Sequence, residues 1–392
     1  MTNERPKKVL IIAGEASGDM HGANLVREVV KQDPSVRFYG VGSRGMQAAG
    51  VHLLADASGI SVVGITEVLT HISTIYRVYA KLKRFLRAER PDLLVLIDFP
   101  DFNILVGKAA KKLGIPILYY ISPQVWAWRK GRIHTIAELV KTMIVVFPFE
   151  VDLYKQAGVD VRFVGHPLTD VAVSDHSVSD ARRLLGLDPL RRVVAILPGS
   201  RRKEIVNLLP DMLGAAAILK ERFPDLQFVL PVAPTLSREV LRSYTDGSAV
   251  PVQLVEGRAY DVLRAADAAI VTSGTATLET GLMGVPMVVV YRMSSASYSL
   301  VRFVAKAKFI ALVNIISNRQ VVPELIQNAV TPAAIADALT PLISDKDIQE
   351  NMKADLRSVR AGLGESGASA RAAAVVREVL NLSRAQRAER KG

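Results

Sequence analysis

Four side chains that can move a proton or hold a polar ligand are concentrated in residues 14–22, which read Gly-Glu-Ala-Ser-Gly-Asp-Met-His-Gly. The segment follows the apolar run 8–13, and we expect a helix from about Ala23. Backbone N–H groups and the helix dipole favour an anionic or polar ligand in such a turn. The turn therefore predicts substrate positioning or proton transfer by four side chains, those of Glu15, Ser17, Asp19 and His21.

Asp98 is the strongest candidate for a general base. It ends the apolar run 93–98, so we expect it at the carboxyl edge of a parallel sheet, beside residues 14–22. Asp101 is expected to be the N-cap of the following helix, whereas Asp98 has no such local role. Partial burial would tune the Asp98 carboxylate for proton abstraction, the alternative being a structural carboxylate.

Two glycine-containing turns in the second half predict a nucleotide diphosphate site. One lies in residues 197–205 and the other in residues 272–279, each between an apolar run and a helical pattern. Backbone N–H groups would bind phosphate there, a guanidinium would chelate two oxygens, and a carboxylate would accept from ribose hydroxyls. The alternative is a pair of ordinary hydroxyl-capped helices with surface charge. The predicted donor-binding residues are Gly199, Ser200, Arg201, Ser273, Gly274, Thr275 and Glu279.

Several classes of function are excluded by what the sequence lacks. There are no cysteines, so thiolate chemistry and disulfides are excluded. Neither Gly-x-Gly-x-x-Gly after a strand nor a Walker lysine motif is present, which argues against a nicotinamide cofactor and a phosphoryl donor. A sugar nucleotide is the remaining interpretation of the two turns.

Two further segments have residues suited to a lipid or sugar substrate. Trp126 and Trp128 precede Arg129; the rings can stack on a sugar or an acyl chain, with the cation near an anion, or they can simply anchor a long loop. Residues 62–87 predict an amphipathic helix with a basic end, which either lies on an anionic membrane or packs on its own sheet. Its apolar stripe includes Val68, Leu69 and Ile72.

Short β-branched runs alternate with helical patterns, which predicts an α/β fold with doubly wound parallel sheets. The length of 392 residues favours two domains, here 1–170 and 171–364, followed by a C-terminal helix and basic tail over 365–392. Ser177 or Ser179 is expected to cap the first helix after the boundary. Eleven strands are expected, at 8–13, 36–41, 93–98, 116–121, 143–147, 161–164, 192–197, 226–231, 252–255, 268–272 and 286–291, and three final helices at 333–342, 346–361 and 368–382.

The charge balance is basic, with 50 Lys and Arg against 38 Asp and Glu, a net charge of +12. Such a balance suits nucleic acid, an anionic membrane or phosphorylated substrates. Nucleic acid is disfavoured because neither zinc-finger spacing nor interleaved aromatic and basic residues occur. We expect a cytoplasmic protein without signal peptide or transmembrane helix.

Together these motifs resemble the lipid-A-disaccharide synthases of Gram-negative bacteria, glycosyltransferase family 19. The resemblance implies a GT-B fold: two Rossmann-like parallel-sheet domains facing a cleft. From their place after the final strand, we expect the C-terminal helices to cover the second domain and cross back to the first. It is carried by residues 13–19, 40–42, 63–69, 97–103, 122–129, 147–150, 165–166, 197–201 and 273–279.

The resemblance implies transfer of 2,3-diacylglucosamine from its UDP carrier to 2,3-diacylglucosamine 1-phosphate (lipid X). The products would be a β-1,6-linked disaccharide phosphate and UDP, formed with inversion, without metal or other cofactor, on the cytoplasmic face of the inner membrane. Asp98 would be the base, in preference to Glu15 or His21. From its charge, and not from the resemblance, we expect Arg129 to meet the acceptor phosphate. A homodimer, another GT-B cell-wall transferase, a UDP-sugar epimerase and a non-catalytic binding module remain open.

One segment departs from the family's pattern. The family has Pro before the position of Asn314, Gly before that of Arg319 and Glu after it, where this chain has Val313, Asn318 and Gln320. We expect Asn314 and Arg319 to contribute to the donor pocket, and we carry over no role for the missing Glu.

Overall fold

The computed structural model describes residues 6–57, 65–123, 131–293 and 308–389. The chain forms two compact units, one of residues 1–170 with 363–392 and one of residues 171–362. Trp126, Trp128 and Arg129 lie outside the described residues, and of Val68 and Leu69 only the backbone is described. Among the described helices none is long and apolar enough to cross a bilayer.

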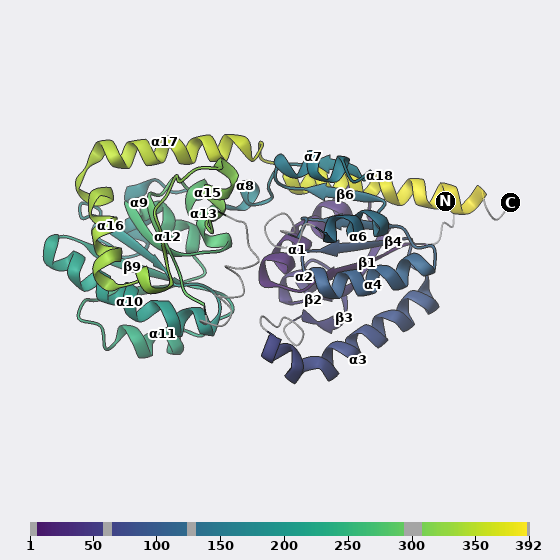
Figure 1. The fold of residues 1–392 in the computed structure, drawn as a ribbon, viewed down its shortest axis with the longest axis horizontal. Helices are drawn as coiled ribbons and strands as arrows, with labels where there is room; N and C mark the ends of the chain where they lie inside the picture. Colours follow the sequence, from purple (N-terminus) through teal and green to yellow (C-terminus); the bar gives the residue numbers. More distant parts are fainter. Residues whose placement is uncertain (1–5, 58–64, 124–130, 294–307, 390–392) are drawn as a thin grey trace. The chain divides into compact units, whose positions relative to one another are not determined.

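The first unit is built on one parallel sheet of seven strands, in the order β3-β2-β1-β4-β5-β6-β7 (Figure 1). Its central strands are fully buried because helices cover both faces, which is why they read as continuous apolar runs. The strands are β1 (Lys7–Ala13), β2 (Val36–Gly42), β3 (His52–Asp56), β4 (Leu93–Ile97), β5 (Ile117–Tyr120), β6 (Thr142–Val145) and β7 (Asp160–Phe163).

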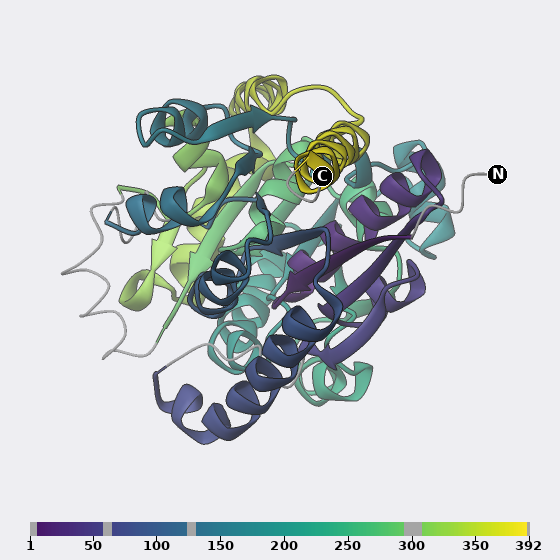
Figure 2. The same cartoon turned by 90° about the vertical axis from the view of Figure 1, so that its right-hand side faces the viewer.

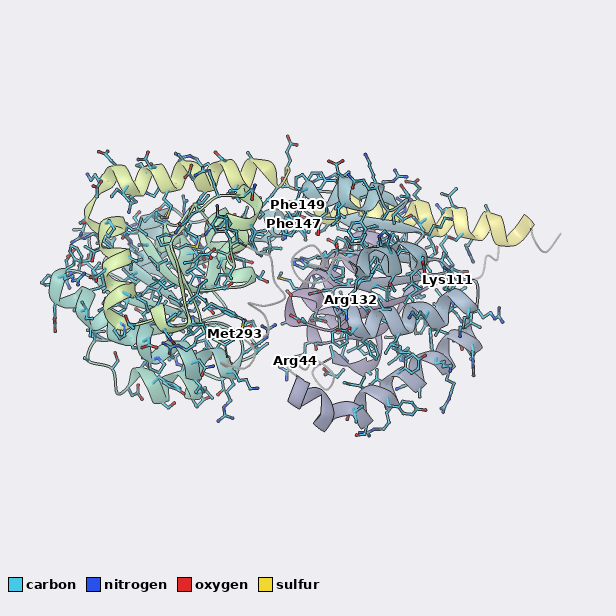
Figure 3. The ribbon with its side chains drawn as sticks, in the orientation of Figure 1. Arg44, Lys111, Arg132, Phe147, Phe149 and Met293 are labelled. Atoms are coloured by element: carbon cyan, nitrogen blue, oxygen red, sulfur yellow. The ribbon has the colours of Figure 1, made fainter. Side chains whose placement is uncertain are left out.

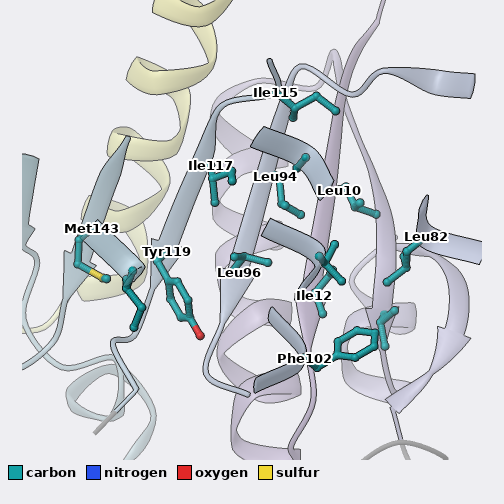
Figure 4. Close-up of a cluster of buried hydrophobic side chains, with 14 of the residues drawn as sticks. Leu10, Ile12, Leu82, Leu94, Leu96, Phe102, Ile115, Ile117, Tyr119 and Met143 are labelled. Carbon is teal, nitrogen blue, oxygen red and sulfur yellow. The ribbon is translucent and has the colours of Figure 1, made fainter. Parts of the chain in front are cut away.

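Alternate residues of these strands face two different sets of helices. One face packs on α1 (Ala16–Gln32) and α18 (Ala368–Glu389), which lie side by side; Figure 2 shows α18 almost end-on. The other face, with Leu10, Leu96 and Tyr119, forms the cluster of Figure 4. It is covered by α3 (Ile65–Glu89), α4 (Pro100–Lys112) and α6 (Arg132–Leu139), while α2 (Arg44–Ala48), α7 (Phe149–Lys155) and α8 (Leu168–Val171) are short connections.

The second unit has a parallel sheet of six strands, in the order β10-β9-β8-β11-β12-β13. Its strands are β8 (Val193–Leu197), β9 (Gln227–Val232), β10 (Val252–Glu256), β11 (Ala268–Thr272), β12 (Met287–Tyr291) and β13 (Glu324–Ile326). Its helices are α9 (Val178–Leu184), α10 (Arg202–Arg222), α11 (Arg238–Thr245), α12 (Ala259–Ala265), α13 (Thr275–Leu282), α15 (Leu312–Ser317), the 3₁₀ turn η2 (Gln327–Ala329), α16 (Pro332–Ser344) and α17 (Lys346–Gly362).

The predicted doubly wound α/β fold is confirmed, and all eleven predicted strands are present within a few residues. The prediction missed β3 and β13, which are short edge strands without a fully buried residue, so neither gives a continuous apolar run. The three final helices are present as α16, α17 and α18, and Ser177 caps α9 by accepting from the Asp180 N–H.

The last helix belongs to the first unit although it follows the second in sequence. The Asp170 carboxylate accepts from the N–H groups of Gly367 and Ser369, at 2.5 and 3.0 Å, and so caps the start of α18. The Arg371 guanidinium donates to the Val164 carbonyl at 2.8 Å. These bonds join residues 164–170, where the chain leaves the first unit, to residues 367–371, where it has returned to that unit.

Candidate active site

Residues 14–22, which we predicted to be a turn before a helix, are helical from Ala16 onward. α1 begins at Ala16, with Glu15 as its N-cap, so Ser17, Asp19 and His21 lie on its first turns. The predicted start near Ala23 was wrong because glycines within the segment weaken the helical signal. Gly22 is needed for packing, since a Cβ there would lie 2.9 Å from the Met46 sulfur.

Asp19 is a structural carboxylate, which contradicts its prediction as a substrate-facing residue. It is 8% exposed, and its Oδ1 accepts from the Ser43 N–H at 2.6 Å and the Met46 N–H at 3.2 Å. Oδ2 accepts from the Gly45 N–H at 2.9 Å. These are the orphan donors at the start of α2, so Asp19 anchors that helix. Glu15 and Ser17, by contrast, are half-buried.

His21 and His166 form a buried pair at the carboxyl edge of the first sheet. Their rings meet edge to face with centroids 6.2 Å apart. The ring of Phe147 lies 5.2 Å from that of His166 and stacks on that of Phe149; Figure 3 labels both phenylalanines. His166 Nδ1 accepts from the Leu168 N–H, whereas His21 Nδ1 has no partner among the described residues. Burial lowers the pKa of His21 to about 4 and that of His166 to about 3. His21 is 5% exposed, which conflicts with its predicted contact to an acceptor.

These lowered pKa values predict a loss of stability in acid. Between pH 6.5 and the folded-state pKa values, the unfolded chain binds protons that the folded protein does not. The stabilisation is therefore present above pH 6.5 and lost as the pH falls. We expect the free energy of unfolding to be about 2 kcal/mol lower per histidine at pH 5 than at pH 7. Urea titrations at the two pH values measure it.

His21→Leu should lower that pH dependence, while the matched substitution of the exposed His134 should not. If the free energy of unfolding depended equally on pH in wild type and His21→Leu, the lowered pKa of His21 would not be the cause of the acid sensitivity.

Asp98 lies directly after β4, as predicted, and is half-buried. Its backbone is left-handed, with φ of 43°, and so is that of Phe99, with φ of 48°. Phe99, not Asp101, is the N-cap of α4, so that part of the prediction was wrong. Asp101 lies in the first helical turn, where its carboxylate pairs with Arg132.

The first predicted donor turn is occupied by a carboxylate of the protein itself. Glu204, in the first turn of α10, accepts from the N–H groups of Ser200 and Arg201 at 2.9 and 3.1 Å. Its other oxygen accepts from the Arg201 guanidinium at 3.2 Å. Gly199 has φ of 113°, and a Cβ there would lie 2.1 Å from Glu204 Oε2. The turn thus binds an anion through backbone N–H groups and Arg201, the chemistry that a diphosphate needs.

The second predicted donor turn lies between β11 and α13. Gly274, with φ of 143°, is the N-cap of α13, and the Ser273 hydroxyl donates to the Ile310 carbonyl at 3.0 Å. Glu279, one turn on, accepts from the Tyr260 hydroxyl at 2.8 Å. Glu279 is half-buried, so it is not the exposed surface carboxylate of the alternative, and burial raises its pKa.

Asn314, which we predicted to contribute to the donor pocket, supports the second donor turn from within the protein. It is completely buried. Its Oδ1 accepts from the N–H groups of Val321 and Val322, and its Nδ2 donates to Glu324 at 2.7 Å. Glu324 also accepts from the Ile310 N–H, and the Ile310 carbonyl holds Ser273.

The departures from the family pattern have a local explanation. Asn318 ends α15 in a left-handed conformation, φ 50°, which asparagine tolerates better than other residues with a side chain and which glycine adopts freely. Gln320 is exposed, and Arg319 pairs with Asp355 of α17 at 2.5 Å. Asn318 thus adopts a backbone conformation that suits the glycine of the family pattern.

Five residues that sequence reasoning missed surround the predicted ones: Asn103, Tyr119, Glu204, Tyr260 and Glu324. Glu204 had a signal, because a carboxylate three residues after a helix N-cap is the capping-box pattern. The two tyrosines had none, since only the tertiary fold brings their hydroxyls to Asp98 and Glu279. No cluster of three or more His, Asp or Glu suited to a metal occurs in the described part of the chain.

Comparison with known proteins assigns the chain to a family. A family model described as lipid-A-disaccharide synthetase matches residues 9–378. A lipid-A-disaccharide synthase of Geobacter metallireducens is 48% identical over 378 residues, covering 96% of this chain and 98% of that protein.

Two solved structures share the fold. A UDP-GlcNAc 2-epimerase from Neisseria meningitidis, bound to UDP-GlcNAc, has a TM-score of 0.64 at 14% identity, covering 95% of this chain and 99% of that one. Acinetobacter baumannii MurG has a TM-score of 0.58 at 15% identity, covering 95% and 100%. At these identities the likeness concerns the fold, which is GT-B, while the full-length sequence match settles the family. The chain belongs to the lipid-A-disaccharide synthase family.

Proposed function

We propose that the protein transfers 2,3-diacylglucosamine from UDP-2,3-diacylglucosamine to 2,3-diacylglucosamine 1-phosphate. The observation that supports this proposal most is the family match over residues 9–378. The arrangement of each unit agrees with it. The first unit presents a half-buried carboxylate at its sheet edge, and the second presents two turns with anion-binding chemistry.

In the proposed reaction Asp98 accepts the proton of the acceptor's 6-hydroxyl as its oxygen attacks the anomeric carbon. The bond from that carbon to the diphosphate breaks, and UDP leaves with the electron pair. One displacement from the opposite face inverts the anomeric configuration. Glu15 and Ser17, both half-buried and near the start of α1, orient the acceptor.

The second unit stabilises the charge that develops on the leaving diphosphate. The Arg201 guanidinium and the backbone N–H groups of residues 200, 201, 274 and 275 lie at the two turns and supply this stabilisation, whereas the Ser273 N–H already donates to the Val290 carbonyl at 3.0 Å. Glu279 binds the ribose hydroxyls, with Tyr260 holding one carboxylate oxygen. Glu204 occupies the first turn in this structure, and the donor's diphosphate replaces it there or binds beside it.

Radiolabelled UDP-2,3-diacylglucosamine incubated with 2,3-diacylglucosamine 1-phosphate tests the proposal. We expect equimolar disaccharide phosphate and UDP. An epimerised sugar nucleotide, or UDP binding without turnover, would contradict it.

We further propose that α3 holds the protein on an anionic membrane. Its later residues Leu82 and Leu86 are buried in the first unit's core, whereas Ile72 and Tyr76 are 57% and 70% exposed. Lys83, Arg84 and Arg87 line one shallow hollow on the same helix, with Ala80 and Ala88. Exposed apolar groups beside clustered cations favour insertion at a negatively charged lipid surface.

Replacing both Ile72 and Tyr76 by Ser should lower the fraction of protein that sediments with phosphatidylglycerol vesicles, by about 10-fold in partition constant. The control is Leu190→Ser, since Leu190 is 93% exposed in the second unit. Undiminished sedimentation of the double variant, or an equal loss in the control, would show that α3 is not the anchor.

A further inference from the structure

The turn that bears Asp98 has a backbone that needs outside support. Asp98 and Phe99 are consecutive non-glycine residues with φ of 43° and 48°. A Cβ makes this left-handed conformation unfavourable, and it persists only where surrounding groups fix it. The conformation also sets the direction of the Asp98 Cα–Cβ bond, and therefore restricts the positions that the carboxylate can reach.

Two buried donors hold this turn through one atom, the Asp98 carbonyl oxygen. The Tyr119 hydroxyl donates to it at 2.6 Å, and the Asn103 side-chain amide donates at 2.5 Å. The same amide donates to the Ile97 carbonyl at 3.1 Å. Tyr119 is 1% exposed and Asn103 is completely buried, so water does not compete for these bonds.

The next residue of the turn is fixed by packing. The Phe99 ring lies against Gly14, where an added Cβ would be 2.3 Å from Phe99 Cγ. It also contacts Phe102, with centroids 5.4 Å apart. Gly14 therefore makes room for the left-handed turn.

Tyr119 reaches the turn because of its place on β5. In Figure 4 its ring lies in the core cluster near Leu96, and its hydroxyl points in the direction in which β4 and β5 run. The pKa of the hydroxyl is well above 10.0, mainly through burial and also through the charge of Asp98, so it stays a proton donor.

We propose that Tyr119 and Asn103 are positioning residues for the catalytic base: they hold the Asp98 carbonyl so that the strained turn aims its carboxylate. This inference rests on the proposed function, in which Asp98 abstracts the acceptor proton. Displacing a reacting group by about 1 Å costs up to about 10²-fold in rate, which sets the scale of the effect.

Tyr119→Phe removes one hydroxyl and no ring packing. We expect kcat to fall by about 10- to 100-fold while the dissociation constant for UDP stays unchanged, because the predicted UDP contacts lie in the other unit. The matched control is Tyr120→Phe, since Tyr120 is equally buried but points to the opposite face of the sheet. Asn103→Ala, which removes the other donor, should repeat the kcat loss.

A double-mutant cycle separates positioning from general damage. In an Asp98→Asn background, Tyr119→Phe should cause no further loss, because the group it positions is already inactive. A further loss there as large as in wild type, a wild-type kcat in Tyr119→Phe, or an equal loss in Tyr120→Phe would overturn the positioning role alone. Wild-type turnover of Asp98→Asn itself would instead overturn the proposed base, and this inference with it.

Discussion

Replacing Asp98 by Asn should lower kcat by at least about 10²-fold while UDP still binds with wild-type affinity. The amide has nearly the same size, so the left-handed turn and the bonds from Tyr119 and Asn103 to its carbonyl are retained. What is lost is the ability to accept a proton. The donor turns are in the other unit, so UDP affinity has no reason to change.

The measurement is turnover of labelled donor beside UDP titration by calorimetry. Asp101→Asn is the matched control, because Asp101 is a carboxylate three residues further along, with its side chain 78% exposed, paired with Arg132 at the surface. We expect the control to keep its turnover. Near-normal activity of Asp98→Asn would move the base elsewhere, and Glu15 would be the next residue to test.

Replacing Asn314 by Leu should lower the free energy of unfolding of the second unit by about 3 kcal/mol or more. Leu fills similar volume but leaves the N–H groups of Val321 and Val322 without their acceptor. It also removes the donor at 2.7 Å to the Glu324 carboxylate. Because Glu324 fixes Ile310, which holds Ser273, UDP should bind more weakly as well.

Urea unfolding measures the first effect, and faster hydrogen exchange over residues 308–326 locates it. Asn318→Gly is the control in the same segment, since glycine adopts the left-handed conformation of Asn318 without strain. Weaker UDP binding with unchanged stability and exchange would mean that Asn314 contacts the donor directly.

The strands could be predicted from sequence because each central strand is buried on both faces and therefore apolar throughout. The positions of Asp98 and of the two donor turns could be predicted from those strands, because the carboxyl ends of parallel strands lie at one edge of a sheet. The role of Asp19 could not be predicted, because its three donors lie 24 to 27 residues away at the start of another helix.

Tyr119 and Asn314 also have contacts that only the tertiary structure creates. Adjacent Tyr119 and Tyr120 are identical in type but point to opposite faces of the sheet, and only the tertiary fold brings the Tyr119 hydroxyl to the Asp98 carbonyl. Asn314 was recognised by its motif, yet its enclosure depends on a loop that closes over it from residues 321–324. Residue type and spacing therefore identify a functional region better than they identify which side chain touches the ligand.

The return of α18 to the first unit has a consequence for synthesis on the ribosome. Residues 171–362 emerge before α18 exists, so the second unit can complete its sheet while the first still lacks a helix that packs on β4 and β5. At typical elongation rates this interval lasts on the order of tens of seconds. We expect the nascent first unit to expose apolar strand surface throughout it, and to close only when Gly367 and Ser369 reach Asp170.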